Sequence, residues 1–143
     1  MREINFRLWD KKHNKMLYSI ASINFDTEDY LPFSVSLPSA SRESRLVNDT
    51  WIEEDGTYVE NKNKEAELMQ YTCLKDKKGN GIYEGDIIRF KHDDYKVPFT
   101  QYIKFVGGTY QTNDYHFYLH EISHYVEIIG NIYENPELLE ESE

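Results

Sequence analysis

Apolar and polar side chains alternate at the start of the chain, as they do in a strand with one buried face. The apolar members of this alternation are Ile4, Phe6 and Leu8, and after a polar stretch the apolar pattern returns at residues 16–20. Two short strands joined by a polar turn are typical of a β-hairpin. We therefore expect an N-terminal hairpin over residues 1–21.

The pattern weakens in residues 22–65, where prolines, serines and acidic side chains interrupt any apolar stripe. This composition is typical of loops, so we expect a loop-rich segment. One hairpin is expected within it, because Asp55-Gly56 lies between the short apolar pieces Trp51-Ile52 and Tyr58-Val59.

Short apolar pieces recur through the rest of the chain, and glycine-containing turns separate them. Asn80-Gly81 is expected to form a tight reversal with positive φ, and Gly107-Gly108 is expected to form a second turn. Strands at this spacing predict a small, strongly bent sheet or SH3-like barrel. The expected strands are residues 68–74, 82–83, 87–90, 102–106, 109–112 and 126–133.

The C-terminal residues predict a buried strand followed by a short helix. Residues 126–133 carry apolar groups on both faces, as a strand covered on both sides does. Asn135 can cap a helix that has Pro136 at its first position, and this helix would place Leu138 and Leu139 against the sheet.

Taken together, the pattern predicts a mainly β protein, with an α+β arrangement left open. We expect a single domain over residues 1–143 with a β-barrel-like core at 66–139 and an acidic tail at 140–143. Aromatic residues make up 15% of the chain, which suits half-buried strands and not disorder.

The net charge of the chain makes nucleic acid a less favoured class of partner. The chain has 26 acidic and 16 basic side chains and a formal net charge of -10, so a generally cationic surface for nucleic-acid phosphates is not expected. A local basic cluster keeps a nucleic-acid-binding barrel open as an alternative. Its members are Lys75, Lys77, Lys78, Arg89 and Lys91.

The single cysteine, Cys73, cannot form an internal disulfide or a cage of several thiolates around zinc. A reducing compartment therefore fits best. No apolar run is long enough to span a membrane, and no apolar stretch follows Met1 as in a secretory signal. We expect a cytoplasmic protein.

One motif suggests metal chemistry. His120-Glu121-Ile122-Ser123-His124 has the HExxH pattern, in which two histidines one helical turn apart bind zinc and the glutamate acts as general base. A local helix is compatible with the pattern, because several apolar residues recur at helical spacing and Asn113 or Asp114 could cap it. The recurring residues are Tyr115, Tyr118, Leu119, Ile122, Tyr125 and Val126.

The rest of a zinc protease site is missing from this sequence. Where a metzincin requires glycine and histidine after the second histidine, the chain has Glu127 and Gly130. An HExxH arises by chance in about 1 to 2% of chains with this content of His and Glu. We therefore expect surface histidines and assign no catalytic, cofactor or metal residue. A zinc hydrolase using His120, Glu121 and His124 remains the less favoured alternative.

Several blocks of sequence together resemble the YopX family of phage and prophage proteins. The blocks are residues 2–10, 68–76, 82–88 and 129–139. The resemblance implies a phage or prophage origin, a mainly β fold and no established activity. The family pattern has glycine where this chain has Cys73, so the resemblance does not imply a nucleophilic cysteine.

These expectations together favour a non-enzymatic accessory protein that acts through protein contacts. Its expected partners are a second copy of itself and a phage or host protein in the cytoplasm of a bacterial host cell. Nucleic acid and membrane are not expected partners, and no cofactor is expected.

Overall fold

The computed structural model describes most of the C-terminal half of the chain and shorter pieces before it. The described residues are 2–11, 14–18, 22–24, 34–36, 45–47, 50–52, 58–60, 66–91, 93 and 98–140. The fold is mostly β, as the hydrophobic pattern predicts.

The chain divides into two compact units. The N-terminal unit comprises residues 7–68, and the C-terminal unit comprises residues 1–6 together with 69–143. Both divisions fall inside strands, namely β1 (Phe6–Asp10) and β8 (Ala66–Lys75).

The predicted N-terminal hairpin is present. β1 pairs antiparallel with β2 (Lys15–Leu17), with Leu8 opposite Leu17 and Trp9 opposite Met16. Asn14 in the turn has φ 50°, a left-handed conformation that asparagine tolerates. The expected one-sided alternation is wrong in detail, because Ile4 precedes the strand and is 67% exposed, whereas consecutive residues Arg7 to Asp10 are all buried.

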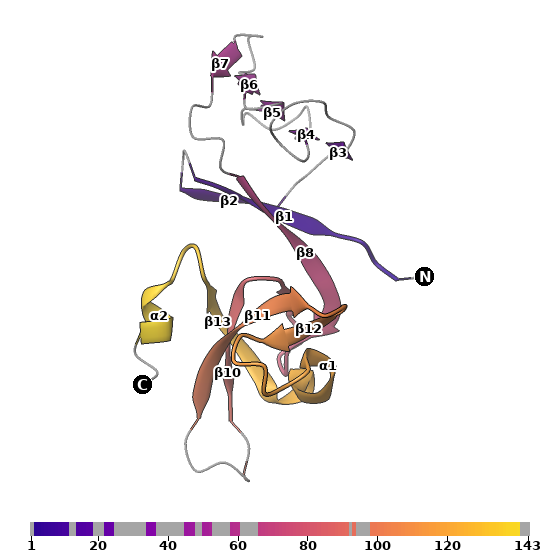
Figure 1. The fold of residues 1–143 in the computed structure, drawn as a ribbon, viewed down its shortest axis with the longest axis vertical. Coiled ribbons are helices and arrows are strands. Elements are labelled where there is room, and N and C mark those ends of the chain that lie inside the picture. The colour runs from indigo at the N-terminus through magenta and orange to yellow at the C-terminus, as the bar shows by residue number, and fades with distance from the viewer. Residues whose placement is uncertain are drawn as a thin grey trace. The chain divides into compact units, whose positions relative to one another are not determined.

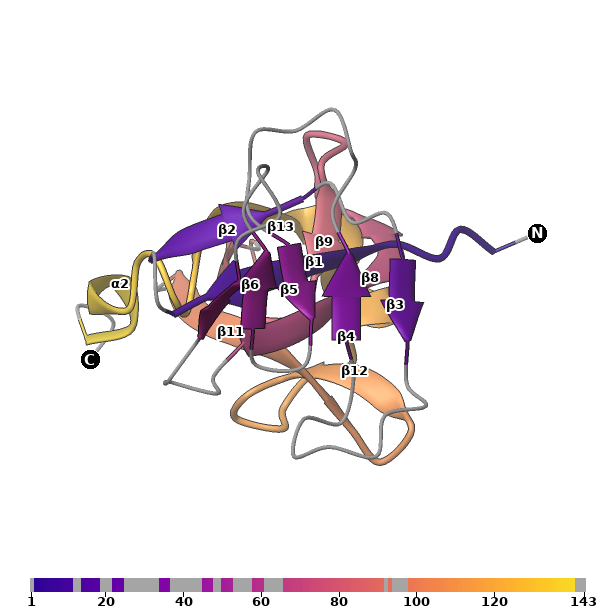
Figure 2. The same cartoon turned by 90° about the horizontal axis from the view of Figure 1, so that it is seen from above.

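Five three-residue strands form the described part of residues 22–65. β3 (Ser22–Asn24) pairs with β4 (Ser34–Ser36), and β6 (Thr50–Ile52) pairs with both β5 (Arg45–Val47) and β7 (Tyr58–Glu60). Figure 2 shows β3, β4, β5 and β6 side by side. The predicted pairing of residues 51–52 with 58–59 is confirmed, while its turn at 53–57 lies outside the described residues.

A curled four-stranded antiparallel sheet forms the centre of the C-terminal unit (Figure 1). Its strand order is β12-β11-β10-β13, and the strands are β10 (Asp86–Phe90), β11 (Phe99–Val106), β12 (Thr109–Thr112) and β13 (Val126–Asn131). Gly107 and Gly108 both have positive φ and connect β11 to β12, as predicted. A second four-stranded sheet has the order β2-β1-β8-β9, where β9 is Gly81–Tyr83.

Two short helical turns cover one face of the curled sheet. They are α1 (Leu119–Ile122) and the 3₁₀ turn Ser123–Tyr125, and both precede β13. The core is a cluster of buried side chains, each of which contributes about 1.5–3 kcal/mol if fully buried. Its members are Ile82, Ile88, Phe90, Ile103, Leu119, Ile122 and Val126.

The reversal before β9 differs from the prediction. The left-handed residue is Gly79, with φ 86°, and Gly81 instead begins the strand. Gly81 lacks a side chain for another reason: a Cβ there would lie 2.8 Å from the ring of Tyr71. The glycine therefore makes room for a neighbouring aromatic ring and does not make the turn.

A short helix, α2 (Glu137–Glu140), follows β13 as predicted. The proposed capping role of Asn135 is wrong, because its side-chain oxygen accepts a hydrogen bond from the backbone N–H of Asn131. Leu138 and Leu139 are half-buried, so the helix covers apolar surface only in part.

Candidate functional site

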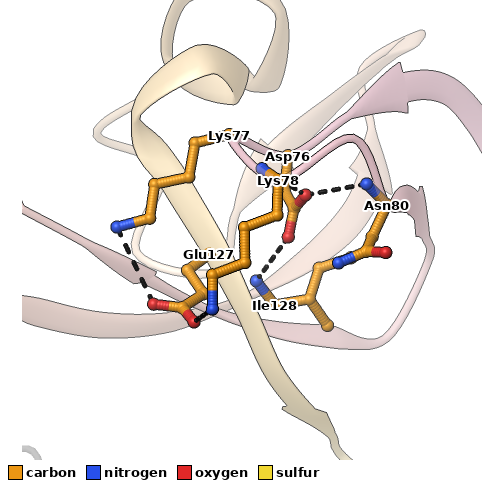
Figure 3. Close-up of polar contacts among 6 residues, drawn as sticks. All are labelled: Asp76, Lys77, Lys78, Asn80, Glu127 and Ile128. Carbon is orange, nitrogen blue, oxygen red and sulfur yellow. Dashed lines mark hydrogen bonds and ion pairs between the residues drawn. The ribbon is translucent and has the colours of Figure 1, made fainter.

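The blocks that resemble the YopX family contain many polar residues, and the structure shows what these residues contact. Asp76 lies at the end of β8, and its buried carboxylate accepts backbone N–H bonds from Lys78 and Asn80, each at 2.9 Å. It also accepts the N–H of Ile128 in β13 at 3.1 Å (Figure 3). One carboxylate therefore shapes a turn and ties it to a strand that is distant in sequence.

The same contacts set the protonation state of Asp76. Burial alone would raise the pKa of this carboxyl, but the N–H groups of Ile128, Asn80 and Lys78 outweigh burial and lower the pKa. Asp76 is therefore an ionised structural acceptor near neutral pH.

Gly85 connects two of the family-like blocks. It has φ 81°, and its N–H donates to the carbonyl of Ile103 while its carbonyl accepts from the N–H of Ile132. Asp86 is 2% exposed and accepts the N–H of Tyr83 at 2.8 Å. Three hydrogen bonds thus hold the turn between β9 and β10, and the Asp86 side chain makes one of them to a backbone N–H.

Asn131 and Asn135 hold the loop that follows β13, and we call residues 131–135 the asparagine loop. The side-chain oxygen of Asn131 accepts the N–H groups of Tyr133 and Glu134, while the carboxamide of Asn135 packs over Gly130. A Cβ at Gly130 would lie 2.5 Å from the Asn135 oxygen, so only glycine fits without a shift.

Cys73 has an unusual backbone conformation. Its φ is 66°, which favours glycine over a residue with a Cβ. The side chain is half-buried, and its thiol donates to the carbonyl of Glu3 at 3.0 Å. The backbone conformation gives a physical reason for glycine at this position in the family pattern.

The predicted basic cluster is partly neutralised. Both Lys77 and Lys78 form ion pairs with Glu127 of β13 (Figure 3), at 3.7 Å for Lys77. The hydrogen bond and charge of Lys78 are the main causes that lower the pKa of Glu127, and Arg89 contributes further. Three of the five predicted cations therefore surround one carboxylate.

Residues 115–125 present a different chemistry, and we call them the tyrosine segment. Tyr115 is 61% exposed, and Tyr118 and Tyr125 are each 46% exposed. The sequence placed these tyrosines on the same apolar stripe as Leu119 and Ile122, which is wrong: only the aliphatic side chains are buried. The regular helix lasts four residues, too short for the stripe to continue.

Local contacts hold the tyrosine segment in place without covering its rings. The Lys104 ammonium lies 3.9 Å from the centroid of the Tyr115 ring, Tyr118 stacks on His120, and Tyr125 contacts Phe90 edge to face. Asp114 does not cap α1, because its carboxylate accepts bonds from Thr112 and His116 instead.

The HExxH histidines lie in the tyrosine segment, and both are exposed. α1 ends at Ile122, so His120 is in the α-helix while His124 is in the following 3₁₀ turn. Among the described residues, no group of three or more His, Cys, Asp or Glu side chains is placed to hold a metal ion. Within the described ranges, no side chain is therefore placed as a third ligand to these two histidines.

Comparison with protein families identifies the family of this chain. The model of the YopX protein family matches residues 5–140. The chain belongs to the YopX family. The turn that follows Asp76, Gly85 and the asparagine loop all fall inside the matched region. Each stabilises the YopX fold through hydrogen bonds to the backbone.

Two solved structures resemble this YopX chain over almost its whole length. The crystal structure of protein EF1440 from Enterococcus faecalis has a TM-score of 0.64 and 27% identity, covering 97% of this chain and 99% of that chain. Protein yopX from Bacillus subtilis has a TM-score of 0.60 and 26% identity, with the same coverage. No curated protein matches the chain.

No helix in the described part of the chain is long and apolar enough to cross a membrane.

Proposed function

We propose that this YopX chain is a non-enzymatic accessory protein, encoded by a phage or prophage, that acts in the host cytoplasm by binding protein. Its first partner is a second copy of itself, and its second is a phage or host protein. The observation that carries this proposal is the exposure of Tyr115, Tyr118 and Tyr125 within one ordered segment. Tyrosine is enriched at the centre of protein interfaces, where it supplies a large apolar face and one hydroxyl.

The remaining polar groups support binding over catalysis. Asp76 and Asp86 are buried and accept backbone N–H bonds, so neither is presented to a substrate. The exposed His120 of the tyrosine segment stacks on the exposed ring of Tyr118. An aromatic surface with scattered polar groups suits a protein partner.

Sedimentation velocity over a range of concentrations tests self-association. We expect the wild type to sediment as an oligomer and a Tyr115→Ser/Tyr118→Ser variant to shift towards monomer. Tyr18→Ser is the matched control, because Tyr18 is 59% exposed but lies outside the segment. A monomeric wild type, or a control that dissociates as much as the double variant, would contradict the proposal.

Zinc content distinguishes the competing hydrolase hypothesis. Protein purified without chelator should carry well below stoichiometric zinc, and His120→Ala should leave its metal content unchanged. Stoichiometric zinc that is lost in this variant would favour the hydrolase instead.

A further inference from the structure

An open pocket of about 330 Å³ lies on one face of the strands that begin the C-terminal unit. Three neighbouring pieces of chain contribute to it: the segment before β1, strand β8 and strand β9. Its volume is within the range of small-ligand sites. The lining residues are Glu3, Asn5, Tyr71, Lys75, Gly81 and Tyr83.

Two tyrosine rings form the aromatic part of the pocket. Tyr71 and Tyr83 are directly opposite each other in the β8–β9 pair, with ring centroids 5.4 Å apart. Gly81 leaves the space that the Tyr71 ring occupies. Rings on adjacent strands of a sheet are a common platform for stacking nucleobases.

The polar groups offer a donor and an acceptor next to these rings. The Asn5 side-chain oxygen already accepts the N–H of Phe6 at 2.9 Å, so its NH₂ group remains as a donor. The Glu3 carboxylate is close enough to Tyr71 that, after burial, its charge is the next cause raising the pKa of that phenol. A carboxylate beside an amide donor matches a base edge that carries both an amine and a carbonyl.

Lys75 supplies a positive charge to the same pocket. Unlike Lys77 and Lys78, which pair with Glu127, Lys75 makes no ion pair with any described residue, and neither does the Glu3 carboxylate. The pocket therefore holds one acid and one base that are both available to a ligand.

We propose that this pocket binds a single nucleotide unit whose base carries an exocyclic amine. The base lies against the half-buried Tyr83 ring and the small exposed part of Tyr71, which is only 7% exposed. Glu3 accepts from the amine, and Lys75 pairs with the phosphate. The formal charge of -10 opposes binding of a long polyanion, so recognition is limited to one unit. That unit is either a free mononucleotide or one exposed base of a single strand.

Calorimetric titration with CMP, UMP and cytidine tests the site. CMP should bind the wild type about tenfold more tightly than UMP, because uracil has a carbonyl where cytosine has the amine. Glu3→Gln should remove this preference. Lys75→Gln should weaken CMP several-fold and leave cytidine unchanged.

The control is Lys77→Gln, which changes the same residue type in the same region but outside the pocket. It should bind CMP as the wild type does. Equal affinity of the wild type for CMP and UMP, the absence of saturable binding, or a Lys77→Gln variant as weak as Lys75→Gln would overturn the proposal. None of these results depends on the tyrosine segment, so the protein-binding proposal would stand or fall separately.

A second titration, with a short oligo(dC) and with dCMP, distinguishes an exposed base of a single strand from a free mononucleotide as the ligand of this pocket. A short oligo(dC) that binds more tightly than dCMP, with a salt slope reduced by about one in Lys75→Gln, indicates an exposed base of a single strand. Equal affinity for the two indicates a free mononucleotide.

Discussion

The asparagine loop after β13 and the tyrosine segment before it are near neighbours in sequence, yet they use their polar side chains in opposite ways. In the loop, Asn131 and Asn135 direct their oxygens to backbone N–H groups of the same chain. In the tyrosine segment, Tyr115 and Tyr118 expose their rings. The comparison shows that the asparagine side chains are used to stabilise the fold, whereas the tyrosine rings remain exposed to solvent.

Removing the Asp76 carboxylate should have the largest effect on the fold. Asp76→Ala leaves the half-buried N–H of Ile128 without its acceptor and weakens the turn at Lys78 and Asn80. We expect a loss of about 3 kcal/mol in the free energy of unfolding, measured by urea denaturation. Asp93→Ala, at an exposed position, is the control. An Asp76 variant as stable as the control would show that the carboxylate is dispensable.

The lowered pKa of Asp76 also predicts a dependence of stability on pH. The native state favours the ionised form, so this contribution is present above the unfolded-state pKa of about 3.9 and is lost as the pH falls through the lower native-state pKa. Urea denaturation from about pH 5 to about pH 2 should show a steeper loss for the wild type than for Asp76→Asn. Parallel curves would contradict this assignment.

Gly130→Ala should have the next largest effect. The added Cβ overlaps the Asn135 carboxamide, which must move and release its bond to Asn131. We expect a loss of about 2 kcal/mol, measured by thermal or urea unfolding. Adding Asn135→Gly removes the overlapping group, so the double variant should lose less than the two single changes together. If the losses of the two single variants simply add in the double variant, the loss caused by Gly130→Ala does not come from overlap with Asn135.

At Cys73 we expect a smaller effect, in which glycine increases the free energy of unfolding relative to alanine. Glycine adopts the left-handed backbone of this position readily, so Cys73→Gly should be about 1 kcal/mol more stable than Cys73→Ala. The alanine variant is the proper reference because it also lacks the thiol bond to Glu3. If alanine proves equal to glycine, the conformation at residue 73 carries no strain.

The smallest effect on stability is expected in the tyrosine segment. Tyr115→Ser and Tyr118→Ser should each change the free energy of unfolding by no more than about 0.5 kcal/mol, because both rings are exposed. Thermal unfolding of monomer at low concentration provides the measurement. A large loss would mean that these rings serve the fold, as the asparagine loop does.

The sequence predicts regular elements well where the pattern is local. The N-terminal hairpin, the Gly107-Gly108 turn and β13 follow from short apolar pieces and the turn residues between them, although the burial expected from alternation in β1 does not hold. Gly81 and Asn135 were misassigned because their roles depend on residues far away or on the other side of a turn, namely Tyr71 and Gly130. No local pattern reveals which group will fill the space beside a glycine.

The candidate sites were less predictable for a related reason. Tyrosine is apolar enough to count in a helical stripe and polar enough to face solvent, so spacing could not separate Tyr118 from Leu119. The pocket around Tyr71 and Tyr83 joins residues from three pieces of chain. Strand register and tertiary pairing bring these residues together, and the local pattern of one segment does not predict either of them.

The strand order of the curled sheet has a consequence during synthesis. β10 pairs with β11 soon after both are made, but its other edge waits for β13. At about 5–20 residues per second, the roughly 35 residues between these strands leave that edge open for several seconds. An open edge can pair with a strand from another chain. Nascent chains made side by side from one message therefore have time to exchange β13 before each closes its own sheet.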